Sequence, residues 1–299
     1  MKKYVIVSDS CCDLNKELRE QYNIDYLPMH FSYDDKDLPA DLDWKELSFK
    51  DFYAEMRAGK RMITSQVNAA QYREAFEKYI ADGYDILSIS CSSGLSNSVK
   101  ASYTVRDELL AKYPDSKIIC IDSLISCYGL GLLCIRASEL RAEGKTIEET
   151  AAWIEENKLT VNQECTPEKL TYLKKAGRVS AASAFFGGLL SVKPILISDV
   201  NGYNAAVEKV KGRLTSLKRL AERVKEEYVR VPHQRIVVVH ADCEEDAETL
   251  KSLVAEALAG EDVTIETGFI GPIVGGSAGP GTVAVYFYGK EVTFDSKAN

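Results

Sequence analysis

Apolar and polar positions alternate in two different periods along the first half of the chain. Short apolar runs are typical of buried strands, and the stretches after them have the spacing of amphipathic helices. The pattern predicts strands over 3–8, 24–33, 84–90 and 117–122, an acidic loop over 34–46, and helices starting at 14, 48, 68, 97, 126 and 146. Asp13 is the expected N-cap of the first helix, and Thr146 with Glu149 forms a capping box for the last. Alternation of strands and helices predicts an α/β fold with a doubly wound, mostly parallel sheet over residues 1–157.

The pattern changes after about residue 158. Two apolar runs, 193–200 and 203–210, flank Asn201–Gly202, which is a strong signal for a β-hairpin. Further helices are expected over 214–228 and 244–259, and further strands over 235–241, 263–269 and 282–288. Neighbouring strands without crossover helices predict a second domain, residues 158–299, of α+β type with a mixed or antiparallel sheet.

Composition narrows the function classes. The 299 residues are 45% hydrophobic and 27% charged, as in ordinary globular proteins, and the net charge is −8. Neither half has a basic excess, which argues against a nucleic-acid partner. The longest apolar stretches are too short to span a bilayer, and Tyr4–Val7 is too short for a secretory core, so we expect a cytoplasmic protein without stable membrane insertion. Eight cysteines without a CxxC pair do not indicate a disulfide scaffold.

Hydroxyl side chains gather where the predicted strands end. In a parallel sheet, ligands bind at the carboxyl ends of strands, where helix N-termini offer free N–H groups. Three segments follow predicted strands, namely Asp9–Ser10, Cys91–Ser98 and Ser123, and a fourth, Thr64–Gln66, precedes the helix expected from Asn68. Helix capping explains one hydroxyl per helix but not the four serines at 92, 93, 96 and 98. The sequence therefore predicts a site for a small anion, either a carboxylate or a phosphate, and Gly94 would allow a ligand to approach the backbone closely.

Several motifs in the sequence would point to an enzyme instead of a binding protein. A Walker motif is missing, and the acidic loop lacks the EF-hand spacing. Gly275–Gly279 fits the GxSxG pattern, but a strand follows it instead of a helix, so a glycine-rich turn between strands is expected there. Asp9 and Asp122, at two strand ends, leave open a Mg²⁺-dependent phosphotransferase or hydrolase. The basic stretch 209–225 is either a solvated helical face or a docking surface for an acidic partner.

A set of short motifs extends over the whole chain. In order along the chain they are Asp9-Ser10-Cys11-Cys12-Asp13-Leu14, Thr64-Ser65-Gln66, Ser92-Ser93-Gly94-Leu95-Ser96, Asp122-Ser123, Leu173-Lys174-Lys175-Ala176-Gly177-Arg178, Lys193-Pro194-Ile195, Gly271-Pro272 and Gly279-Pro280-Gly281. In this order and spacing the chain resembles the DegV family of bacterial fatty-acid-binding proteins. It departs from the family pattern at Val67, at Asn97-Ser98 and at Ser277, where the family usually has a histidine.

The resemblance implies two α/β domains with a long-chain fatty acid buried between them. It implies that hydroxyls matching Thr64 and Ser96 hold the carboxylate, and we expect Ser65, Ser93 and Ser277 beside them. It also implies a carrier role without catalytic residues, metal or cofactor, in which the bound acid is presented to a separate ATP-binding fatty acid kinase subunit. That kinase makes the acyl phosphate used in phospholipid metabolism. Arg178 is the residue expected to face this partner.

Overall fold

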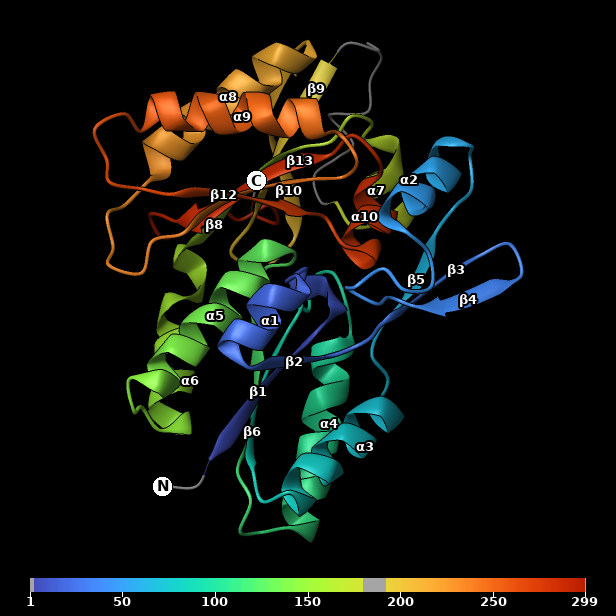
Figure 1. Cartoon of the computed structure of the whole chain (residues 1–299), viewed down its shortest axis with the longest axis vertical. Coiled ribbons are helices and arrows are strands. Elements are labelled where there is room, and N and C mark those ends of the chain that lie inside the picture. Colours follow the sequence, from blue (N-terminus) through green and yellow to red (C-terminus); the bar gives the residue numbers. More distant parts are fainter. Residues whose placement is uncertain (1–2, 180–191, 299) are drawn as a thin grey trace.

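The computed structural model describes residues 3–179 and 192–298, which form three sheets with helices packed around them (Figure 1). The first sheet has the order β2-β1-β6-β7 and is parallel throughout. Its strands are β1 (Tyr4–Asp9), β2 (Ile24–Leu27), β6 (Asp85–Ser90) and β7 (Ile118–Asp122). Helices α1 (Lys16–Tyr22), α5 (Tyr128–Ala142) and α6 (Ile147–Asn157) lie on one face, and α3 (Ala69–Ala81) and α4 (Ser98–Lys112) lie on the other. The doubly wound parallel sheet is confirmed.

The second sheet has six strands in the order β10-β9-β8-β13-β11-β12. These are β8 (Val161–Thr166), β9 (Val192–Ser198), β10 (Asn204–Lys211), β11 (Ile236–His240), β12 (Ile265–Phe269) and β13 (Val283–Tyr288). Only β11 and β12 pair in parallel, so the mixed sheet and the β9–β10 hairpin are both confirmed. Helices α8 (Arg213–Glu227) and α9 (Glu244–Ala257) cover one face, and the other face contacts α5.

A third, smaller sheet was not expected. It is antiparallel, with the order β4-β3-β5, and lies at the right of Figure 1 beside the helices α2, α7 and α10. Its strands are β3 (His30–Tyr33), β4 (Lys36–Pro39) and β5 (Ile63–Ser65), and the helices are α2 (Phe49–Arg57), α7 (Thr171–Ala176) and α10 (Pro272–Ala278). Helix α10, from the C-terminal part of the chain, contacts α2, β3 and β5, so it packs against this N-terminal sheet. Two short 3₁₀ turns, η1 (Ser10–Cys12) and η2 (Lys158–Thr160), complete the fold.

Three local predictions in the first fifty residues were wrong. The single strand expected over 24–33 is two strands in different sheets, because Pro28 has no N–H for a ladder and the Met29 N–H bonds the Ser10 hydroxyl at 2.9 Å. The acidic stretch 34–46 is not only loop, since β4 pairs there with β3. Asp13 does not cap the first helix; Asn15 does, its side chain accepting from Leu18 N.

The basic stretch around α8 is largely paired within the protein. Arg223 forms an ion pair with Glu164 at 2.6 Å, and the Glu164 side chain is almost fully buried. Arg219 bonds Glu208 and Glu226. Burial raises the pKa of Glu164 to about 7 although Arg223 opposes the shift. These pairs hold α8 on the six-stranded sheet, which favours a structural role over a free docking surface.

The serine loop after β6 meets the β9–β10 hairpin at a contact without room for side chains. The Ser92 hydroxyl donates to Gly202 O at 2.8 Å, and a Cβ on Gly94 would lie 2.9 Å from the same oxygen. Gly94 was expected to let a ligand approach the backbone closely. In the structure it is the backbone of this hairpin that approaches Gly94 closely. Gly202 has a φ of +73°, and a Cβ there would overlap the Ser92 hydroxyl.

We expect Gly202→Ala to lower the free energy of unfolding by about 1–2 kcal/mol more than Gly144→Ala does. Both glycines have positive φ, but a Cβ on Gly144 has nothing within 4 Å, so the comparison isolates the contact from the backbone strain. Denaturant unfolding of both variants measures the difference. Equal losses would mean that the serine loop and the hairpin are not tightly packed in solution.

Candidate functional site

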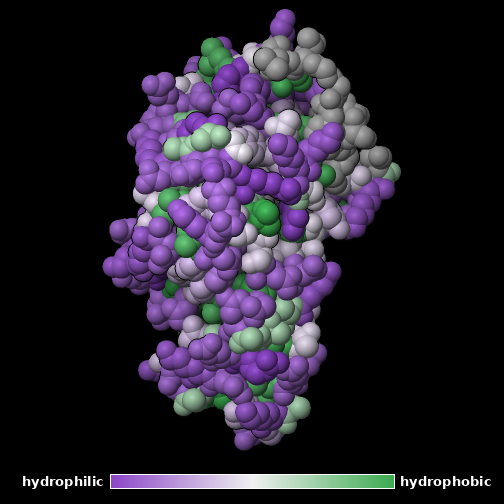
Figure 2. Space-filling model, turned by 90° about the vertical axis from the view of Figure 1, so that its right-hand side faces the viewer, coloured by the Kyte–Doolittle hydropathy of each residue, from purple (hydrophilic) through white to green (hydrophobic). Residues whose placement is uncertain are grey.

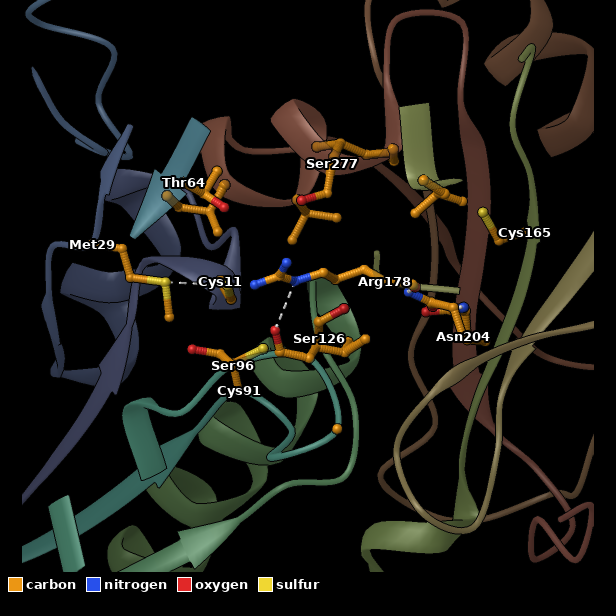
Figure 3. Close-up of a pocket in the computed structure, with 18 of the residues that line it drawn as sticks. Cys11, Met29, Thr64, Cys91, Ser96, Ser126, Cys165, Arg178, Asn204 and Ser277 are labelled. Atoms are coloured by element: carbon orange, nitrogen blue, oxygen red, sulfur yellow. Dashed lines mark hydrogen bonds between the residues drawn. The ribbon is translucent and has the colours of Figure 1, made fainter. Parts of the chain in front are cut away.

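A cavity of about 470 Å³ lies where the three sheets meet (Figure 3). Its walls are the loops after β1 and β6, the end of β5, helix α10, and the face of the six-stranded sheet opposite α8 and α9. The structure brings all of the sequence-predicted site residues to this one cavity, namely Thr64, Ser65, Ser93, Ser96, Arg178 and Ser277. They come from segments far apart in the sequence, so only the fold unites them.

The hydroxyl groups at the cavity divide into bonded and unbonded ones. Ser96 Oγ lies 3.0 Å from Ser98 Oγ, and Ser98 Oγ in turn accepts from Val67 N at 3.1 Å, so this pair also orders the start of α4. In contrast, the hydroxyls of Thr64, Ser93 and Ser277 have no hydrogen bond to the rest of residues 3–179 and 192–298. The hydroxyls of Ser65 and Ser126, which also line the cavity, likewise have no hydrogen bond within these residues, so five hydroxyl donors remain available to an anionic group.

The segment 275–279 is not the turn between strands that the sequence suggested. Residues 275–278 form the last turns of α10, and Gly279, with a φ of +88°, ends the helix. A Cβ on Gly275 would overlap the Tyr53 hydroxyl of α2, and one on Gly276 would lie 3.1 Å from Met62 Cβ. The glycines therefore let α10 pack closely against α2 and β5, which places Ser277 on the same side of the cavity as Thr64, opposite Ser96 (Figure 3).

Asp9 and Asp122 order the loops that form the cavity. The Asp9 carboxylate accepts from Cys11 N at 3.0 Å and from Cys91 N at 2.8 Å, and its complete burial raises its pKa to about 6. Asp122 Oδ1 accepts from Ser93 N at 3.0 Å and from Leu124 N at 3.1 Å. Within the described part of the chain, groups of three or more possible metal-ligating residues are absent.

Arg178 reaches into the cavity from the segment after α7. Gly177, with a φ of +68°, ends that helix, and the Arg178 Nε then donates to Leu95 O at 3.2 Å (Figure 3). Among the described residues that line the cavity, Arg178 is the one cation, and none of them is Asp or Glu. The electrostatics of the cavity therefore suit an anion.

A buried polar network beside Arg178 was missed by the sequence reasoning. Tyr286 Oη donates to Gln163 Oε1 at 3.1 Å, Gln163 Nε2 donates to Asn204 Oδ1 at 3.0 Å, and Asn204 Nδ2 donates to the Arg178 carbonyl at 3.0 Å. This network fixes the backbone of Arg178 to the six-stranded sheet. Gln163 and Cys165 of β8 are two residues apart, as expected of side chains on one face of a strand, and both line the cavity. The strand was not predicted because its sequence is mostly polar, so this spacing was not recognised.

Asp13 is a buried carboxyl group beside the cavity. Its oxygens have no hydrogen bond of normal geometry within the described residues, although the Cys127 thiol and the Gly271 backbone lie near it. Burial raises the pKa of Asp13 to about 7, and those two neighbours offset the effect only in part. The charged form of Asp13 is therefore unfavourable in the folded protein.

Asp13→Asn should raise the melting temperature at pH 8 and leave it nearly unchanged at pH 4. The pKa of Asp13 is higher in the folded than in the unfolded chain, so the folded state holds more protons between about pH 4 and 7, and its stability falls as pH rises through that range. Asparagine removes this loss and tolerates the positive φ of 51° at this position.

The matched control for this prediction is Asp242→Asn, because the pKa of Asp242 is shifted in the opposite direction to that of Asp13. Burial alone would raise the pKa of Asp242, but Lys50 and Arg57 hold it below its ordinary value, so asparagine there should lower stability at pH 8. Thermal unfolding at both pH values checks the pair. A lower melting temperature for Asp13→Asn at pH 8 would contradict the assignment.

The fold and the cavity define a class of protein. Three packed sheets enclose a site with hydroxyl donors and one arginine, as expected of a protein that binds an anionic ligand between its layers. Residues 3–290 match the model of a family described as "Uncharacterised protein, DegV family". The chain belongs to the DegV family.

Individual relatives are similar to this chain over nearly its full length. A DegV domain-containing protein of Clostridium perfringens is 39% identical over 97% of this chain and 98% of its own. The crystal structure of DegV from Bacillus subtilis, described as a fatty acid binding protein, has a TM-score of 0.82 and 27% identity over 97% of this chain and 100% of its own. A Thermotoga maritima structure described as a DegV lipid binding protein has a TM-score of 0.83 and 26% identity, with the same two coverages.

In the described part of the chain, each helix is too short or too polar to cross a membrane.

Proposed function

We propose that this protein binds one long-chain fatty acid in the cavity between its sheets. The observation that carries the proposal is a group of unbonded hydroxyls, among them Thr64, Ser93 and Ser277, in a cavity whose described lining residues include one arginine and no acidic residue. A carboxylate accepts up to four hydrogen bonds and needs such donors when it leaves water. Ser65 and Ser96 complete the hydroxyl end of the proposed site.

The rest of the cavity suits an acyl chain. Its apolar lining comes from the six-stranded sheet, from helices α7 and α10 and from loops, and includes Met29, Leu95, Leu173, Leu196, Ile270, Ile273, Val274, Ala278 and Ala284. Burial of each methylene group contributes about 0.8 kcal/mol, so a long chain gains substantially from such a lining. The fatty-acid binding described for the Bacillus subtilis relative supports the same assignment. In this proposal residues 1–157 supply most of the head-group loops and residues 158–299 cover the chain.

The protein acts as a carrier in this proposal, in the cytoplasm and without catalytic residues of its own. It presents the bound acid to a separate ATP-dependent fatty acid kinase, which makes the acyl phosphate for phospholipid metabolism. Arg178 supports this assignment because it is exposed and reaches from the surface to the hydroxyl end of the cavity.

Displacement of a fluorescent fatty acid from the delipidated protein tests the binding step. Palmitic acid should displace the probe with a 1:1 stoichiometry, and hexadecanol should do so far less well because it lacks the carboxylate. Equal displacement by the acid and the alcohol would contradict a head-group site built from hydrogen-bond donors.

A further inference from the structure

A second pocket, of about 200 Å³, adjoins the hydroxyl end of the main cavity. It lies between the end of α2, the start of β5, helix α7 and the last turn of α10. Thr64, Arg178 and Ser277 line both pockets. A group held by these three residues therefore has the main cavity on one side and the second pocket on the other.

The second pocket is strongly basic. Its described lining includes the cations Lys60, Arg61, Lys169, Lys175 and Arg178, and none of its described lining residues is acidic. Lys60 is paired with Asp34. The other four form no ion pair with residues 3–179 or 192–298. Such a concentration of unpaired positive charge attracts anions, and it contrasts with the net charge of −8 of the whole protein.

The positions of these cations are fixed by the fold. Arg61 Nη2 donates to the Lys175 carbonyl at 3.1 Å, which joins the strand end to helix α7. The α7 and β5 elements face the viewer in Figure 2, where hydrophilic residues cover most of the surface. The pocket's cations Arg61, Lys169, Lys175 and Arg178 are exposed, so they are accessible to solvent and to a partner.

We propose that the second pocket holds the phosphoryl group of the acyl phosphate after the bound acid has been phosphorylated. This inference rests on the proposed function, because it places the carboxylate at Thr64, Ser277 and Arg178. In the transfer step a carboxylate oxygen attacks the terminal phosphorus of a nucleoside triphosphate supplied by the partner. The new O–P bond forms as the bridging O–P bond breaks, and a nucleoside diphosphate leaves. A phosphoryl group attached to that oxygen lies next to the carboxylate, on the side where the cations are.

In this proposal the two pockets recognise different groups, the carboxylate of the acid and the phosphoryl group of the product. The main cavity recognises an acid through neutral hydroxyls and Arg178, whereas Lys169 and Lys175 line only the second pocket. A phosphoryl group attached to the carboxylate is larger, carries up to two negative charges and extends further toward these lysines than the carboxylate does. The two lysines should therefore discriminate product from substrate without changing the affinity for the acid.

Hexadecylphosphonic acid is a stable probe for the phosphorylated head group, and palmitic acid is the matched carboxylate. We expect Lys169→Gln and Lys175→Gln each to weaken binding of the phosphonate about 3- to 10-fold at pH 8 and to change palmitic acid binding less than twofold. Lys174→Gln is the control, because Lys174 lies on the same helix but does not line the pocket. Isothermal titration of the delipidated protein measures all of these affinities.

The outcomes separate the two proposals. Selective loss of phosphonate affinity in the two variants supports the phosphoryl site. Equal phosphonate affinity in the wild type and all variants, with palmitic acid still bound, overturns this inference but leaves the proposed function intact. Lysine-dependent binding of ATP or inorganic phosphate without any effect on the phosphonate would also overturn it, because the group would then be free phosphate. Failure of the wild type to bind palmitic acid would overturn the proposed function itself.

Discussion

Arg178→Gln should reduce acyl phosphate formation by about 100-fold when the protein is combined with the proposed kinase subunit, ATP and a bound fatty acid. The Arg178 guanidinium lines both pockets and is the cation nearest the hydroxyl end of the main cavity. In the proposed reaction the negative charge on the carboxylate and the incoming phosphate meets at this point. Glutamine keeps some hydrogen-bonding capacity but removes the fixed charge.

The measurement is the yield of acyl hydroxamate after trapping with hydroxylamine. Palmitic acid binding should fall less than tenfold, because the hydroxyls still hold the carboxylate. Arg106→Gln is the control, since Arg106 lies on α4 and lines neither pocket. A variant with full kinase competence would show that Arg178 is not at the reacting group.

Thr64→Val should weaken palmitic acid binding by about 10- to 100-fold, because a hydrogen bond to a charged group contributes about 1.5–3 kcal/mol. Valine keeps the shape of threonine and suits a strand, so β5 and its pairing with β3 should persist. The Thr64 hydroxyl has no other partner among the described residues, so its loss disturbs only the ligand.

Two controls accompany this variant. Binding of hexadecanol should be nearly unaffected, since no charged oxygen is lost. Thr104→Val removes a hydroxyl that bonds the Lys100 carbonyl on the exposed side of α4, and it should leave acid binding unchanged. Unaltered affinity of Thr64→Val for palmitic acid would show that the carboxylate does not bind at Thr64.

Most strands of the two main sheets could be predicted from the sequence because they follow strong periodicities, but β8 was missed because its sequence is mostly polar. Strand β7 is a nearly continuous apolar run, as expected of a strand covered on both faces, and the Asn201–Gly202 turn lies at the β9–β10 hairpin. The small third sheet could not be predicted. Strand β5 has only three residues, and the four-residue β4 contains Lys36, Asp37 and Pro39, which are typical of a loop. Their pairing depends on β3, which Pro28 separates from β2.

The site could be predicted in part. The hydroxyl clusters at 64–65 and 93–96 indicated an anion site from their positions before a predicted helix and after a predicted strand, whereas Ser277 and Arg178 came from the family resemblance. The polar network of Gln163, Asn204 and Tyr286 and the basic pocket beside α7 could not be predicted, because their members come from strands, helices and loops far apart in the chain. A cavity between sheets is a property of the packing, and local patterns do not contain it.

Native mass spectrometry of the purified protein tests the central claim most directly. The account predicts one adduct per chain with the mass of a long-chain fatty acid. This adduct should disappear on delipidation, return on addition of palmitic acid, and be weaker in Thr64→Val. Apoprotein alone, with no uptake of any long-chain fatty acid after delipidation, would contradict it.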